Sequence, residues 1–184
     1  MGELAAMICG AVFAVTMREE AEVYCRLRKP FPSKELAMAI KQITPKEAYE
    51  LLEKEPDCVY IDVRTVPEFA AGHPKGAVNI PVAIRDPARG MALNEDFVRV
   101  VEGHFPKEKK IIVGCQAGPR SERAARLLEQ AGYQDLSNME GGYGGMRDPQ
   151  GRTVAPGWST VGLPISQENG EGISYESLAA KTGI

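Results

Sequence analysis

Residues 111–121 constrain the fold most strongly, because an apolar run there passes directly into a short loop that begins with a cysteine. Residues 111–114 have the composition of a buried strand. Over residues 122–132, apolar and charged side chains recur with helical spacing, which predicts an amphipathic helix. Cys115 therefore starts a loop that ends at the N-terminus of a helix.

A cysteine in this position is expected to be reactive. The first N–H groups of a helix lack partners within it, and the helix dipole adds partial positive charge there. Together with Arg120, they favour the nucleophilic thiolate of Cys115 over the thiol. Gly118, Arg120 and Ser121 are also typical of a backbone cradle for an anion. The alternative is an inert cysteine at the end of a core strand, which would need none of these residues.

Three blocks of the sequence resemble the rhodanese family. Residues 115–121 fit its pattern Cys-x-x-Gly-x-Arg-Ser, and residues 60–81 are similar to its Asp-x-Arg, Glu-Phe, Gly-His and Gly-Ala-x-Asn-Ile-Pro signature. Residues 139–143 resemble its closing strand and glycine turn. The similarity covers about residues 43–165. It implies an α/β rhodanese-like three-layer fold, in which a parallel sheet is covered by helices on both faces.

The order of predicted elements agrees with that fold. Thr44 predicts a helix N-cap, and Pro45 suits the first turn that follows it. Further helices are predicted at 67–71, 95–105 and 122–132, and strands at 58–63, 77–80, 110–114 and 135–139. Alternation of this kind is typical of a parallel sheet whose ligands bind beyond the carboxyl ends of its strands.

Length and composition indicate one domain with two extensions. The 184 residues are 43% apolar, and we expect an N-terminal extension at 1–37, the rhodanese-like domain at 38–166 and a C-terminal tail at 167–184. Residues 4–15 are mostly apolar, but too short for a membrane helix and preceded by an acidic residue, so neither a signal peptide nor a membrane partner is expected. Either the extension is a helix that packs on a partner or second subunit, or Met38 is the natural start.

Charge and cysteine spacing exclude several classes of partner. A net charge of −3, without a basic run interleaved with aromatics, gives no reason to expect nucleic acid. Cysteines at 9, 25, 58 and 115 have neither the spacing of a metal site nor that of a disulfide framework. We therefore expect no metal and a reducing cytoplasmic location. A monomer or weak dimer is expected because no heptad or broad apolar face is evident outside residues 4–15. Cys58 is interpreted as a core residue, with a thiol that resolves a persulfide as the alternative.

The resemblance implies a sulfurtransferase of the thiosulfate:cyanide type that needs no cofactor. Cys115 would take a sulfane sulfur from thiosulfate or a low-molecular-weight persulfide, and pass it to a thiol, cyanide or a protein acceptor. The anionic donor and the persulfide would be bound by the rest of the loop, namely Gln116, Ala117, Gly118, Arg120 and Ser121. Pro119 lacks an N–H, so the cradle has one donor fewer than the family arrangement could offer.

Asp62, Arg64 and Glu68 are expected to support the site structurally. The resemblance implies that Arg64 pairs with Glu68 and that Asp62 orders the neighbouring loop, with a catalytic carboxylate as the alternative. His73 and His104 lack the spacing of metal ligands. Residues 147–158 look like an insertion relative to the family.

Two other functions remain open at this stage. Some relatives of this fold are phosphatases or arsenate reductases, whose cysteine loop cradles a tetrahedral oxyanion. Four residues separate Cys115 from Arg120, as in the sulfur-transferring members, whereas the oxyanion enzymes have one residue more. The domain could instead be a non-enzymatic module that relays persulfide sulfur to a protein partner or senses oxidants.

Overall fold

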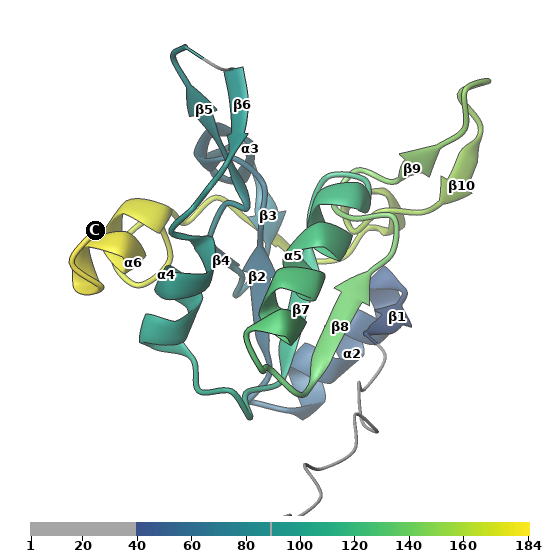
Figure 1. Ribbon diagram of the computed structural model, residues 1–184. Helices are drawn as coiled ribbons and strands as arrows, with labels where there is room; N and C mark the ends of the chain where they lie inside the picture. Colours follow the sequence, from purple (N-terminus) through teal and green to yellow (C-terminus); the bar gives the residue numbers. More distant parts are fainter. Residues whose placement is uncertain (1–39, 89) are drawn as a thin grey trace, which may run out of the picture. The chain divides into compact units, whose positions relative to one another are not determined.

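The computed structural model describes residues 40–88 and 90–184, so the expectations for residues 1–37 and for a start at Met38 lie outside the described residues. Its centre is a five-stranded sheet with the order β1-β8-β7-β2-β4 (Figure 1). All neighbouring strands in this sheet are parallel, as predicted. The strands are β1 (Lys41–Ile43), β2 (Val59–Asp62), β4 (Val78–Asn79), β7 (Ile111–Gly114) and β8 (Leu136–Met139).

Helices cover both faces of the sheet, which confirms the expected three-layer architecture. Alternate residues of β7 point to opposite faces, so Ile111 and Val113 join one apolar cluster while Ile112 joins the other. The larger cluster contains side chains of α4 (Phe97–His104), α5 (Pro119–Gln130) and α6 (Tyr175–Lys181). The smaller cluster contains side chains of α2 (Pro45–Lys54) and α3 (Val66–Ala70).

Local signals explain where two of these helices begin. Thr44 caps α2 as predicted, and its side chain and that of Glu47 form a reciprocal capping box. Helix α5 begins at Pro119, three residues before the predicted start at residue 122. Proline suits the first helical position because its missing N–H would have no helical partner there. Gly118, with a φ of +117°, lies outside the conformations that other residues readily adopt and caps this helix.

Short antiparallel elements flank the sheet and were not predicted. Strands β5 (Ala83–Asp86) and β6 (Gly90–Leu93) form one hairpin, and β9 (Met146–Arg147) and β10 (Thr153–Ala155) form another. Both hairpins project beyond the end of the sheet at which α5 begins (Figure 1). Strands β3 (His73–Pro74) and β11 (Ile165–Ser166) also pair, and η1 (Ser159–Val161) is a short 3-10 helix. Strand β1, which precedes α2, was likewise missed.

The segment that looked like an insertion ends in a core residue. It contains Arg147 of β9 and all of β10, and it ends at Trp158, whose side chain is fully buried. The indole ring lies edge-on to the rings of Tyr49 and Tyr60, with both centroids 5.9 Å away. Its Nε1–H donates to the carbonyl oxygen of Pro164 at 2.8 Å. The hairpin is therefore anchored to the smaller cluster.

The C-terminal residues also contribute to the core. Residues 167–184, expected to be a tail, contain α6, whose Leu178 and Ala179 are buried in the larger cluster. Ser174 caps this helix by accepting the N–H of Ser177. A ring nitrogen of His104 also lies 2.8 Å from the carbonyl oxygen of Leu178. The helix was missed because its seven residues are too few to show a clear helical period.

Leu178→Ala should lower the free energy of unfolding by about 2–3 kcal/mol, because it removes a buried side chain between helices. Urea unfolding followed by circular dichroism measures the difference. Ile184→Ala is the matched control, since Ile184 is 42% exposed, and its effect should stay below about 0.5 kcal/mol. Equal effects of the two substitutions would show that α6 is not part of the cooperative core.

Candidate active site

Cys115 directly follows β7, at the carboxyl end of the central strand. Its Sγ lies 3.0 Å from the backbone nitrogen of Gly118, which donates to it, and 3.5 Å from the hydroxyl oxygen of Ser121. The side chain is only 1% exposed and packs with the larger apolar cluster. The predicted loop cysteine and its alternative, a core cysteine, are combined in the structure, because the sulfur contacts the loop but packs with the apolar cluster.

The loop after Cys115 offers several unused hydrogen-bond donors. Within the described residues, no hydrogen bond is found for the backbone N–H groups of Gln116, Ala117, Arg120 and Ser121. The last two belong to the first turn of α5, where the helix itself supplies no acceptor. The Ser121 hydroxyl contacts the carbonyl oxygen of Gly118 at 2.8 Å and so ties the start of the helix to the loop. Such a set of free donors is suited to an anion.

A glycine turn behind the loop determines its position. The N–H of Tyr143 donates to the carbonyl oxygen of Cys115 at 2.7 Å, and that of Gly144 donates to the carbonyl oxygen of Gln116 at 2.9 Å. Gly142 has a φ of +60°, and a Cβ there would lie 2.4 Å from the carbonyl oxygen of Cys115. Only glycine allows this approach. We expected residues 139–143 to be a family landmark and did not foresee this contact.

Arg64 connects the sheet to both segments. Its guanidinium forms an ion pair with Asp62 at 2.7 Å, and both side chains are at most 2% exposed. The same group donates to Gln116 Oε1 at 3.2 Å and to the carbonyl oxygen of Gly72 at 2.7 Å. It also lies over the ring of Tyr143, 4.2 Å from its centroid. The expected pairing of Arg64 with Glu68 is therefore wrong, because the nearer Asp62 holds this arginine.

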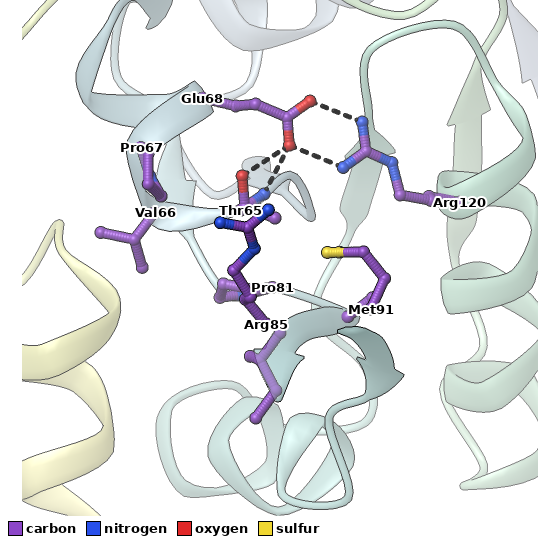
Figure 2. Close-up of a pocket in the computed structure, with 10 residues that line it drawn as sticks. Thr65, Val66, Pro67, Glu68, Pro81, Arg85, Met91 and Arg120 are labelled. Atoms are coloured by element: carbon purple, nitrogen blue, oxygen red, sulfur yellow. Dashed lines mark hydrogen bonds and ion pairs between the residues drawn. The ribbon is translucent and has the colours of Figure 1, made fainter. Parts of the chain in front are cut away.

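Glu68 instead pairs with Arg120, as Figure 2 shows. Each carboxylate oxygen accepts one guanidinium N–H, and both distances are 2.7 Å. The carboxylate also accepts the hydroxyl and the backbone N–H of Thr65, at 2.7 and 3.0 Å. The Arg120 hydrogen bonds, with smaller contributions from Thr65, lower the pKa of Glu68 from its ordinary 4.5 to about 2. The charge of Arg120 is thus largely balanced within the protein.

The surroundings of His73 indicate a structural role and not a catalytic one. The imidazole of His73 is buried and stacks on Phe69, with centroids 3.7 Å apart. Its two ring nitrogens lie beside the carbonyl oxygens of Pro74 and Glu168.

Burial raises the pKa of the Cys58 thiol to about 11, which keeps it protonated at neutral pH. Among residues 40–88 and 90–184, no cluster of acidic, histidine and cysteine side chains could hold a metal ion, and no helix could cross a bilayer.

This cysteine loop, on a parallel sheet covered on both faces, defines the class of protein. Residues 44–148 match the family model described as "Rhodanese-like domain". The chain belongs to the rhodanese-like family.

Individual relatives support the same assignment. The chain is 41% identical over 105 residues to thiosulfate sulfurtransferase 16, chloroplastic, of Arabidopsis thaliana, covering 57% of this chain and 77% of that protein. It is 31% identical to thiosulfate sulfurtransferase GlpE of Haemophilus influenzae (strain PittEE), covering 70% and 96%. The crystal structure of Rv0390 from M. tuberculosis superposes with a TM-score of 0.58 at 31% identity, covering 70% and 98%. The chain spans less than half the length of several other curated relatives that it matches.

Gly142→Ala should destabilise the protein by more than about 2 kcal/mol, because the new methyl group meets the Cys115 carbonyl in addition to the cost of a positive φ. Gly151→Ala is the matched control: its φ is +80°, but nothing lies within 4 Å of the new Cβ. It should incur only the backbone cost, about 1 kcal/mol. Chemical denaturation of both variants measures the difference, and equal losses would contradict the role of Gly142 in holding the loop.

Glu68→Gln should lower the free energy of unfolding at neutral pH by about 1 kcal/mol, because it removes a partly exposed bidentate ion pair. The native-state pKa of Glu68 lies below its ordinary value, so this stabilisation is complete above about pH 4.5 and disappears as the pH falls toward 2. Unfolding curves of both proteins across this range measure the trend. Glu122→Gln, in the exposed pair with Arg126, is the control and should have little effect. A Glu68 difference that did not change with pH would refute the explanation.

Proposed function

We propose that this protein is a sulfurtransferase that carries a sulfane sulfur as a persulfide on Cys115. The main support is the position of Cys115 Sγ, 3.0 Å from the Gly118 nitrogen and within a loop whose other N–H groups have no partner among the described residues. A donated hydrogen bond at this distance stabilises sulfur as an anion, both as the attacking thiolate and as the later persulfide. Names of relatives that include thiosulfate sulfurtransferase support the same reaction class.

In the first half-reaction, the Cys115 thiolate attacks the outer sulfur of thiosulfate. A sulfur–sulfur bond forms to Cys115, the bond between the two sulfurs of thiosulfate breaks, and sulfite leaves with the bonding electron pair. The total charge is unchanged, since one thiolate and one dianion become one persulfide anion and one dianion. A low-molecular-weight persulfide would react in the same way and leave as a thiolate.

In the second half-reaction, a thiophilic acceptor removes the outer sulfur and returns Cys115 to the thiolate. Cyanide would become thiocyanate, and a small or protein thiolate would become a persulfide. Between the two half-reactions, the persulfide anion would be bound by the free N–H groups of Gln116, Ala117, Arg120 and Ser121. The Arg120 side chain, engaged by Glu68, would mainly brace the loop.

This chemistry needs a reduced thiol between turnovers. We therefore propose a reducing compartment such as the cytoplasm as the place of action, consistent with free thiols at Cys58 and Cys115. No cofactor enters either half-reaction.

Incubation of the purified protein with thiosulfate should add one sulfur atom to its intact mass, and cyanide should remove that sulfur as thiocyanate. Cys115→Ser should lose the added mass and the turnover but keep the fold, because serine is nearly isosteric and can still accept the Gly118 N–H. Cys58→Ser is the matched control and should retain full activity, since the pKa of Cys58 keeps that thiol protonated.

Other outcomes would favour other functions. Release of phosphate from a phosphate ester, without added sulfur, would support an oxyanion enzyme. Persulfide formation from a small donor, with no transfer to cyanide or to small thiols, would support a relay to a protein. Turnover that survives in Cys115→Ser would contradict the proposal.

A further inference from the structure

A pocket of about 730 Å³ is lined by both members of the Glu68–Arg120 ion pair (Figure 2). Its apolar wall comes from the start of α3 and from the β5–β6 hairpin, through Val66, Pro67, Ile84 and Met91. This volume is typical of sites for organic molecules and far exceeds the needs of a small inorganic anion.

The pocket adjoins the cysteine loop through Arg120, which lines it. Arg120 follows Gly118 by two residues, and the N–H of Gly118 donates to Cys115 Sγ at 3.0 Å. Arg120, in the first turn of α5, therefore belongs both to the pocket lining and to the segment whose N–H groups are free for an anion. A donor whose organic part lies against the hairpin would have its reactive end on the Arg120 side of the pocket.

The two arginines of the pocket lining differ in whether a carboxylate balances their charge. Arg120 is balanced by Glu68 through two hydrogen bonds of 2.7 Å, so it attracts a dianion only weakly. Arg85 also lines the pocket, and no ion pair is found for it within the described part of the chain. In the hairpin it lies directly opposite Met91, so this free cation sits beside the apolar wall.

We propose that this pocket binds the organic part of the sulfur donor, and that the preferred donor is a monoanion with an apolar body, such as an organic thiosulfonate or persulfide. The inference deepens the proposed function and rests on it. Exposed apolar side chains of the lining, including Met91 at 55% exposed and Ile84 at 38%, would be covered by that body. With a thiosulfonate, Cys115 takes the outer sulfur and an organic sulfinate leaves with the electron pair, so charge and atoms balance.

The test compares kcat/KM for benzenethiosulfonate and thiosulfate, with cyanide as the common acceptor. The wild-type protein should prefer benzenethiosulfonate. Met91→Ser should lower kcat/KM for benzenethiosulfonate by about tenfold, because it removes an apolar contact, and leave thiosulfate unchanged. Ile165→Ser is the matched control, since Ile165 is 57% exposed but lies on β11 outside the pocket lining, and both donors should be unaffected.

Glu68→Gln should change the preference in the opposite direction. Release of Arg120 from its carboxylate partner should raise kcat/KM for dianionic thiosulfate more than for the monoanion, mainly through a lower KM. A merely structural role of Glu68 would instead lower kcat/KM for both donors equally.

An unchanged donor ratio in Met91→Ser, or an equal loss with both donors, would overturn the pocket assignment. The proposed function would survive either result, because thiosulfate would still add sulfur to Cys115 in the intact mass. If neither donor added sulfur to the wild-type protein, both proposals would fail together.

Discussion

The buried ion pair between Asp62 and Arg64 is the interaction on which the site depends. A buried charge without partners is costly, so this arginine must keep the acceptors that surround it. These acceptors come from different parts of the chain: the end of β2, the Gly72 carbonyl, Gln116 in the cysteine loop, and the Tyr143 ring. One guanidinium thereby sets the positions of the loop and the glycine turn relative to the sheet.

The site is built from backbone groups more than from charged side chains. Backbone N–H groups of the glycine turn donate to the carbonyl oxygens of Cys115 and Gln116 and so fix the loop. The N–H groups of the loop itself remain available to an anion. The cation at the end of the cysteine loop, Arg120, is balanced by Glu68. In the proposed function, donor choice would depend on the shape and polarity of the surroundings, and the β5–β6 hairpin lines the pocket that includes Arg120.

Features with strong local signals were predictable. The apolar run directly before Cys115 predicted a buried strand, which is β7, and Thr44 marked the start of α2. The parallel sheet followed from the alternation of such segments. The two hairpins were missed because their strands are mostly exposed and carry no continuous apolar run, unlike the equally short buried strands of the sheet. Helix α6 was missed because its seven residues show no clear helical period.

Propensity, capping and apolar periodicity act over a few neighbouring residues, so the sequence alone predicts helices α2 to α5, four strands of the sheet and the place of Cys115 after β7. The partners of the charged groups depend on contacts between distant parts of the chain. Both Arg64 and Arg120 have carboxylates close to them in the sequence. Residue spacing alone cannot say which carboxylate pairs with which arginine. Folding places Arg120 beside Glu68, 52 positions away, and leaves Arg64 with Asp62, because each buried or half-buried charge must find its acceptors in three dimensions.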